Sequence, residues 1–205
     1  MKKIISILML AVICVLFISA LSSAADNVNY YIKVKIVGSN VSITIPNSGD
    51  ETVNLGYVVE GSSVVTGSGG SGRTITKNNG TAQVTLKLKI TGKPTGWTVQ
   101  TSSLGPTGVN QFCLATVFET WNQTIQFSDF EDNDIITETD KTCGDASNGT
   151  FATSGTASDE DGYQITPGQE VSNFYFFNAP TSLSNTSQYY QEQTITITAT
   201  AFEDH

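Results

Sequence analysis

The chain has 205 residues, 14% of them charged, and its formal net charge is −9 at pH 7. An acidic protein repels nucleic acid and anionic lipid, so neither is expected as a partner. The only histidine is His205, so Ser-His-Asp and Cys-His catalysis and histidine-ligated metal sites lack their central residue. We therefore expect a protein that is not an enzyme.

The first 25 residues have the pattern of a secretory signal peptide. Lys2 and Lys3 precede an apolar run over residues 4–21, and small residues occupy positions 22–25. Cleavage after Ala24 or Ala25 satisfies the small-x-small rule. The alternative is an uncleaved signal anchor, because the run is nearly long enough to span a bilayer. On the first interpretation the mature protein is one domain over residues 26–205, secreted or at the cell surface, without a membrane span.

The charges of this mature part are unevenly distributed. Residues 26–100 hold seven basic and four acidic side chains. Residues 101–205 hold one basic side chain, Lys141, and fifteen acidic ones. The second half of the chain is therefore expected to attract cations.

Alternation of apolar and polar residues predicts strands from the start of the mature part. The first three strands are residues 32–36, 41–45 and 53–60. In the third, the alternation places one set of apolar residues on the same face, namely Val53, Leu55, Tyr57 and Val59. Residues 61–72 are rich in glycine and serine and predict a flexible loop.

The most regular alternation lies in residues 82–91, where five apolar residues share one face. A short strand is predicted just before it, at residues 73–77. Asn79-Gly80 between the two is a strong local signal for a hairpin. Glycines and a proline then end the long strand ahead of Trp97, a large aromatic residue that we expect in the core.

Further strands are predicted at residues 111–118, 124–128, 171–177 and 193–202, with an acidic stretch of small residues at 129–162. No segment after the signal peptide has a helical period. Nine or ten short strands separated by Gly, Pro and Asn turns predict an all-β fold, an Ig-like sandwich of two antiparallel sheets.

Several short motifs follow one another in an order that resembles a known family. Asn79-Gly80, Leu86-Lys87-Leu88 and Pro94-Thr95-Gly96-Trp97 are similar to the Ig-like domain often appended to bacterial α-galactosidases and surface proteins, and CARDB-type adhesion domains are similar. Pro167-Gly168, Phe174-Tyr175-Phe176, Ala179-Pro180 and the threonine-rich residues 194–200 continue that order. The chain departs from the family at residues 98–166, where the family has a short connection. The resemblance implies an accessory or structural module without catalysis.

Two cysteines remain after signal cleavage, Cys113 and Cys143. In an oxidising compartment an isolated pair is expected to form a disulfide. This bond would close a loop of about 31 residues within the acidic insertion and stabilise the fold by about 3–4 kcal/mol.

Carboxylates gather in two places in this insertion. The first holds Asp129, Glu131, Asp132 and Asp134, and the second holds Asp159 and Asp161. Oxygen ligands close together on loops suit calcium, so Ca²⁺ is the one cofactor that the sequence suggests. Neither stretch fits the EF-hand spacing. The alternative is solvated charge that keeps an extracellular protein soluble.

Two other kinds of site can be considered. A sugar-binding sandwich needs exposed, flat aromatic side chains, and the candidates are Trp121, Tyr189 and Tyr190, with local packing as the alternative for Trp121. Hydrolysis by two carboxylates needs no histidine, and it stays open for Glu119, Glu131 and Glu170, although nothing in the sequence places two of these together.

These observations favour a secreted, non-enzymatic structural or adhesive protein of the cell surface or of a filament. Strands near both ends of the mature part could pair with a neighbouring copy, so the protein itself is the first expected partner. The alternative is a carbohydrate-binding accessory module with surface polysaccharide as its partner. A glycosidase with a carboxylate pair is the third hypothesis.

Overall fold

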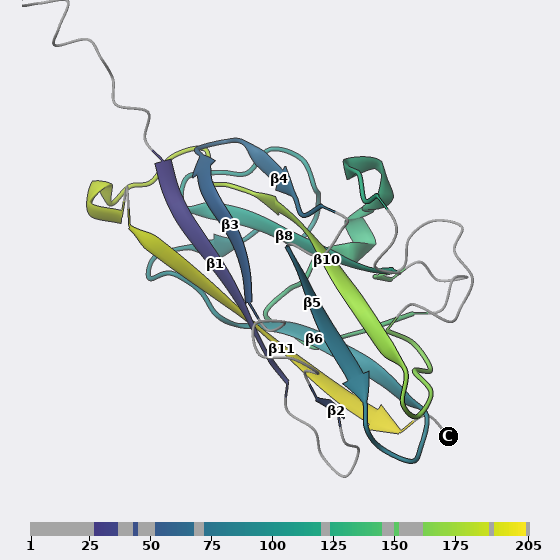
Figure 1. The fold of residues 1–205 in the computed structure, drawn as a ribbon. Coiled ribbons are helices and arrows are strands. Elements are labelled where there is room, and N and C mark those ends of the chain that lie inside the picture. Colours follow the sequence, from purple (N-terminus) through teal and green to yellow (C-terminus); the bar gives the residue numbers. More distant parts are fainter. Residues whose placement is uncertain are drawn as a thin grey trace, which may run out of the picture.

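The computed structural model describes residues 27–36, 43–44, 52–67, 72–119, 124–144, 150–151, 162–188 and 191–203, with the backbone alone for 27–36, 43–44 and 203. The predicted signal peptide lies outside these residues. The described part contains eleven strands and three short 3₁₀ helices. The strands form two sheets that pack face to face, which confirms the predicted all-β sandwich (Figure 1).

The strand order is β3-β1-β11-β6-β9 in the first sheet and β2-β5-β10-β8-β7 in the second, where β4 also pairs with β10. The first sheet consists of β3 (Thr52–Val59), β1 (Asn27–Ile36), β11 (Glu192–Glu203), β6 (Val84–Gly92) and β9 (Lys141–Thr142). The second consists of β2 (Ile43–Thr44), β5 (Arg73–Asn78), β10 (Glu170–Asn178), β8 (Gln111–Glu119), β7 (Thr98–Val99) and β4 (Ser63–Val65). The helices are η1 (Phe127–Asp129), η2 (Asp132–Asp134) and η3 (Thr186–Gln188).

Most neighbouring strands are antiparallel, as predicted. The pairs β1–β11 and β7–β8 are parallel, so the sandwich is not purely antiparallel. Strands β7, β8 and β9 come from residues 98–166, which the resemblance to Ig-like domains predicts to be an insertion. These residues therefore supply strands to both sheets.

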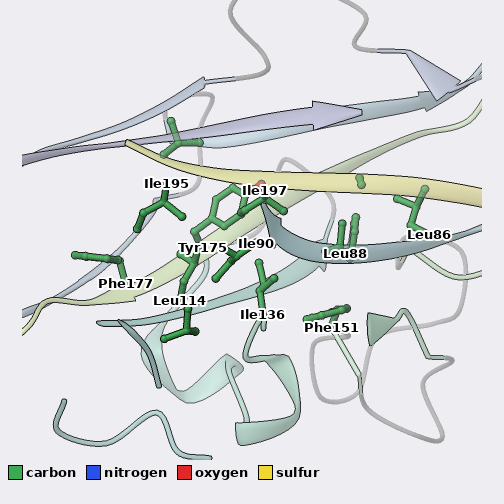
Figure 2. Packing of buried hydrophobic residues seen from close by; sticks show 14 of the residues in the cluster. Leu86, Leu88, Ile90, Leu114, Ile136, Phe151, Tyr175, Phe177, Ile195 and Ile197 are labelled. Carbon is green, nitrogen blue, oxygen red and sulfur yellow. The ribbon is translucent and has the colours of Figure 1, made fainter. Parts of the chain in front are cut away.

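The core fills the space between the sheets (Figure 2). Ile195 and Ile197 of β11 and Leu88 of β6 point toward Leu114 of β8 and Tyr175 of β10, and all five are buried. Burial of one such side chain stabilises a fold by roughly 1.5–3 kcal/mol. Trp97 is also buried in this cluster, with its ring centroid 5.8 Å from that of Phe112, so its predicted place in the core is confirmed.

Strand β6 has the predicted alternation. Leu86, Leu88 and Ile90 are buried, whereas Lys87 and Lys89 are half-exposed. The neighbouring β11 has the same pattern, with buried Ile195 and half-exposed threonines. The period of two is therefore a reliable guide for these two paired strands.

Strand β3 does not keep one face toward the core, and the predicted alternation is wrong there. Val53 and Val58 are buried, whereas Tyr57 and Val59 are exposed. The register with β1 shifts between Asn54 and Tyr57, because β3 contains one extra residue there, at a β-bulge. Gly56 adopts φ +66° in the bulge, and its N–H donates to Oδ1 of Asn54. The bulge reverses the facing of every later side chain.

The hairpin predicted at Asn79-Gly80 is also wrong, because β5 and β6 belong to different sheets. Asn78 explains the crossing. Its buried side chain donates to the carbonyls of Ala82 and Ile165, each at 2.8 Å, and accepts from the N–H of Gly80 at 2.9 Å. These bonds direct the chain from the second sheet to the first.

Two other local predictions differ from the structure. Part of the predicted flexible loop at residues 61–72 forms β4, which pairs with Phe176–Asn178 of β10. Residues 124–128 do not form a strand but enter η1. The reason is packing: Ile125 and Phe130 on either side of η1 are buried against the outer face of the second sheet, in a second cluster that includes Phe174 and Phe176.

Candidate functional site

The first strand, β1, lies in the interior of the first sheet, between β3 and β11 (Figure 1). On one side Asn29–Ile36 pair in parallel with Glu192–Ala199, and on the other side β1 pairs with β3 in antiparallel. Both edges of β1 are therefore used in sheet formation. The first and last strands of the described chain lie side by side.

The strands that flank β1 carry part of the core. Val53 and Val58 of β3 and Ile195 and Ile197 of β11 are buried. The register sets Ile32 beside Ile195 and Val34 beside Ile197. Without β1, the sheet would have a gap here, with unpaired backbone groups along β3 and β11. We call the space between β3 and β11 the β1 slot.

The acidic residues around η1 and η2 mainly hold the backbone of their own segment. Oδ2 of Asp129 accepts from the N–H of Gln126, and Oδ2 of Asp134 accepts from the N–H of Glu131, both at 2.7 Å. Asp132 accepts from the N–H of Leu104 at 2.8 Å. These carboxylates close two consecutive turns and tie them to the loop before β8.

Asp134 is the one of these acids that is completely buried. Its second oxygen, Oδ1, accepts from the N–H of Phe151 at 2.6 Å. Burial raises the pKa of this carboxyl to about 7, although both backbone hydrogen bonds and the nearby Lys141 favour the charged form. Burial likewise lowers the pKa of Lys141, which donates to the carbonyls of Asn133 and Ile135.

A calcium site is not assembled by the acids that the structure describes. Asp129, Asp132 and Asp134 are each directed at a different backbone N–H, and no group of three or more acidic, cysteine or histidine side chains converges within the described ranges. Asp159 and Asp161 lie outside those ranges. Calcium binding that involves these two residues stays a prediction.

Cys113 and Cys143 are not joined by a disulfide, so the predicted bond is wrong. Cys143 and Phe118 both contact Gly162, whereas Cys113 lies five residues from Phe118 along β8, about 16 Å at 3.3 Å per residue. Five residues also place Cys113 on the other face of β8, in the second cluster. A disulfide requires Cα atoms within about 7 Å.

The predicted sugar platforms Trp121, Tyr189 and Tyr190 lie outside the described residues. Nearby, Nε1 of the buried Trp97 donates to Oε1 of Gln188 in η3, at 3.1 Å. That bond places the end of η3 over the core.

The three carboxylates considered for hydrolysis are partly brought together. The β8–β10 register sets Glu119 opposite Ser172, two residues from Glu170 on the same face of the sheet. Glu119 is buried, and Glu170 is bound to Lys77 at 3.1 Å. Glu131 lies in the turn before η2, where it forms part of a capping arrangement.

Sequence reasoning missed the β1 slot, and it named Asp134 as a candidate calcium ligand without predicting its burial. A signal for the second exists: Gln126 and Asp129, then Glu131 and Asp134, repeat one spacing of three residues, which is typical of reciprocal caps at the start of helical turns. No comparable local signal marks the slot, because it depends on which strands become neighbours.

Comparison with known proteins finds no protein-family model that matches the chain and no curated protein with significant similarity. The resemblance to an Ig-like accessory domain therefore stays a prediction. Among the described residues, no helix has the length and apolar character needed to cross a membrane.

Proposed function

We propose that this chain is a secreted structural protein of the cell surface or of a filament, and that its copies are joined by exchange of β1. The observation that carries the proposal is the position of β1 between β3 and β11. β1 lies near one end of the chain and fills the interior of a sheet. Such a strand can be supplied by another copy, because its ladder hydrogen bonds are made only with the two strands on either side of it.

The connection to β1 supports this proposal. Only residues 37–42 separate β1 from β2, which belongs to the second sheet. Six residues span at most about 20 Å when extended. Predicted signal cleavage would leave β1 at the start of the mature chain, where one end is not tethered. The strand can then enter its own slot or that of a neighbour, and the protein concentration sets the balance.

The sequence of β1 fits either slot equally. Ile32, Val34 and Ile36 alternate with Lys33 and Lys35. In the register the apolar set lies beside Ile195, Ile197 and Ala199, whose side chains are buried. A donated β1 in the same register would restore the same sheet, so exchange costs little in contact energy.

The test uses a cysteine pair that joins β1 to β11. Tyr31 and Thr194 are register partners, so Tyr31→Cys with Thr194→Cys cross-links the strand wherever it resides. Exchange predicts covalent ladders of the concentrated mature protein on a non-reducing gel, and these ladders disappear with reductant. The control is Lys87→Cys with Thr200→Cys, partners on β6 and β11 that exchange does not separate. This control gives cross-links within one chain only.

The same variants can overturn the proposal. If Tyr31→Cys with Thr194→Cys gives only intramolecular cross-links, at high concentration and after refolding at high concentration, β1 is not exchanged. Electron microscopy of the mature wild-type protein provides the independent readout, since exchange along a row of copies produces filaments.

A further inference from the structure

The loop between β10 and β11 carries an asparagine that meets the sequence rule for N-linked glycosylation. The rule is Asn-x-Ser/Thr, where x is any residue except proline. Asn185, Thr186 and Ser187 satisfy it, and all three residues are exposed. The last two open η3, which protrudes from the sandwich beside the start of β11 (the short yellow-green coil in Figure 1). A bulky group attached to Asn185 would therefore extend into solvent without displacing the core.

The side chain of Asn185 is oriented by Ser187. Oδ1 of Asn185 accepts from the backbone N–H of Ser187 at 3.1 Å and from its Oγ at 2.8 Å. A backbone N–H can only donate, so the amide atom that faces it is the oxygen. Nδ2 of Asn185 therefore points the other way, and it makes no hydrogen bond with the part of the chain that the structure describes. The amide nitrogen is accessible, while the hydroxyl that the rule requires contacts the same amide group.

We propose that Asn185 is the acceptor of an N-linked oligosaccharide. The donor is an oligosaccharide carried on a lipid pyrophosphate. A bond forms between Nδ2 of Asn185 and the anomeric carbon of the first sugar, and the bond from that carbon to the phosphate oxygen breaks. The lipid pyrophosphate leaves with the bonding electron pair, and a base of the transferase takes one amide proton, so no oxidant or reductant is needed. The proposal rests on the export in the proposed function, because this rule applies to secreted proteins.

The contacts at Asn185 are local, which distinguishes this site from Asn79. Four other Asn-x-Ser/Thr sequences begin at Asn40, Asn79, Asn122 and Asn148, and of these four asparagines only Asn79 is within the described residues. The turn at Asn79 depends on Asn78, whose side chain accepts from the N–H of Gly80 and donates to the distant carbonyl of Ile165. At Asn185 both bonds stay within three residues, so an exported chain can form them before it folds. Asn185 is therefore the better acceptor of the two.

The alternative role of Asn185 is to cap η3. An asparagine oxygen that accepts the N–H two residues on is a common cap at the start of a helical turn. Two substitutions separate the two roles. Asn185→Asp keeps an oxygen for the cap and removes Nδ2, whereas Ser187→Ala keeps the backbone N–H of the cap and removes the hydroxyl. Capping alone predicts no attached sugar in the wild type or in either variant.

The test uses the full chain secreted by a eukaryotic cell, which has the required transferase and lipid-linked sugar. One form keeps residues 1–25, and in a second form a signal peptide of the host replaces them. Mass spectrometry of the peptide that contains residue 185, before and after treatment with peptide-N-glycosidase, measures the attached sugar. We expect a sugar on the wild type and on Ser187→Thr, and its complete loss in Asn185→Asp and Ser187→Ala. Thr186→Ser changes the middle residue within the rule and should keep the sugar.

Exported wild-type protein without a sugar at residue 185 overturns the inference, and so does a sugar there that is retained in Ser187→Ala. The form with the host signal peptide gives these results whether or not the chain's own signal peptide works. Export by the host signal peptide but not by residues 1–25 contradicts the secretion in the proposed function and leaves the result at Asn185 valid. Urea denaturation checks that the two variants without sugar are folded, and they should unfold like the deglycosylated wild type, since both changes are at exposed positions.

Discussion

The backbone N–H of Phe151 donates a 2.6 Å hydrogen bond to Oδ1 of Asp134 inside the protein. The carbonyl of Phe151 in turn accepts from the N–H of Phe118 on β8, at 2.9 Å. Phe151 and Ile136, which lies two residues after Asp134, pack against the core next to Leu88 (Figure 2). One buried carboxyl thus links the η2 turn, a separate loop and strand β8 of the second sheet.

The first prediction concerns the pH dependence of stability. Burial raises the pKa of Asp134 to about 7, while an unfolded Asp titrates near 3.9. The folded state therefore binds more protons than the unfolded state between about pH 4 and pH 7, so this carboxyl lowers the unfolding free energy as pH rises through that window. At 1.36 kcal/mol per pKa unit, the loss is roughly 3–4 kcal/mol. Below about pH 4 the carboxyl is neutral in both states and the contribution is complete.

Asp134→Asn removes this titration, so the difference in unfolding free energy between variant and wild type should rise in favour of the variant from pH 4 to pH 8. Urea denaturation at several pH values measures it. Lys141 is the cation that faces Asp134, and Glu131 is the neighbouring acid. Lys141→Met should move the transition of the wild-type profile to higher pH, because it removes the charge that favours the ionised carboxyl. Parallel profiles for wild type and Asp134→Asn would show that this carboxyl does not titrate in that range.

The second prediction concerns a close contact at Gly162. A Cβ added there would lie 2.5 Å from Sγ of Cys143 and 2.8 Å from Cε2 of Phe118. Gly162→Ala must therefore displace packed core atoms, and we expect a loss of about 1–3 kcal/mol in unfolding free energy. Gly67→Ala is the matched control, since a Cβ there meets nothing within 4 Å and the change should stay within about 0.5 kcal/mol. Equal stability of the two variants would contradict the packing described around Cys143.

The sequence predicts the strands in which the alternation of buried and exposed residues runs without interruption. The alternation in β6 is kept because the paired strand β11 has the same alternation and the apolar residues of both strands lie in the core. The alternation in β3 fails after Gly56, because one bulge residue reverses the facing of Tyr57 and Val59. The alternation alone does not show this bulge, although an isolated glycine inside a strand, here Gly56, is a sequence signal for one.

The candidate sites were less predictable than the fold, because they depend on contacts between distant residues. Cys113 and Cys143 satisfy every sequence criterion for a disulfide, yet β8 separates them onto different faces. The acids near η1 and η2 suit a cation by composition, but three of them accept backbone N–H groups of specific residues. The β1 slot requires knowing that the first and last strands are neighbours.

The third prediction concerns the thiols of Cys113 and Cys143. Both cysteines are buried, and burial together with the negative charge of Asp132 raises the pKa of Cys113 to about 12. A protonated, buried thiol does not react, because the thiolate is the nucleophile. We expect no modification by a thiol reagent in the native state and two modifications after denaturation without reductant, counted by mass spectrometry. Modification only after reduction would contradict the structure, because the protein would then carry a disulfide between these two distant residues.

The last prediction concerns a polar pair within the core. The hydroxyl groups of Thr74 and Tyr175 lie 2.6 Å apart, and both residues are buried. Tyr175→Phe leaves the Thr74 hydroxyl without this partner, and Thr74→Val leaves the tyrosine hydroxyl without it. Each change should cost about 1–3 kcal/mol, because a buried polar group that loses its hydrogen bond keeps its full desolvation penalty.

The double variant, Thr74→Val with Tyr175→Phe, should cost clearly less than the sum of the two single changes, because it leaves no hydroxyl of this pair unpaired. The coupling energy from urea denaturation should be about 0.5–3 kcal/mol. Thr116→Val provides a comparison, since its hydroxyl donates to the carbonyl of Phe174 at 2.8 Å rather than to this pair. Its cost should add to that of Thr74→Val. Additive costs within the Thr74–Tyr175 pair would mean that the two hydroxyl groups do not stabilise one another across the β5–β10 contact.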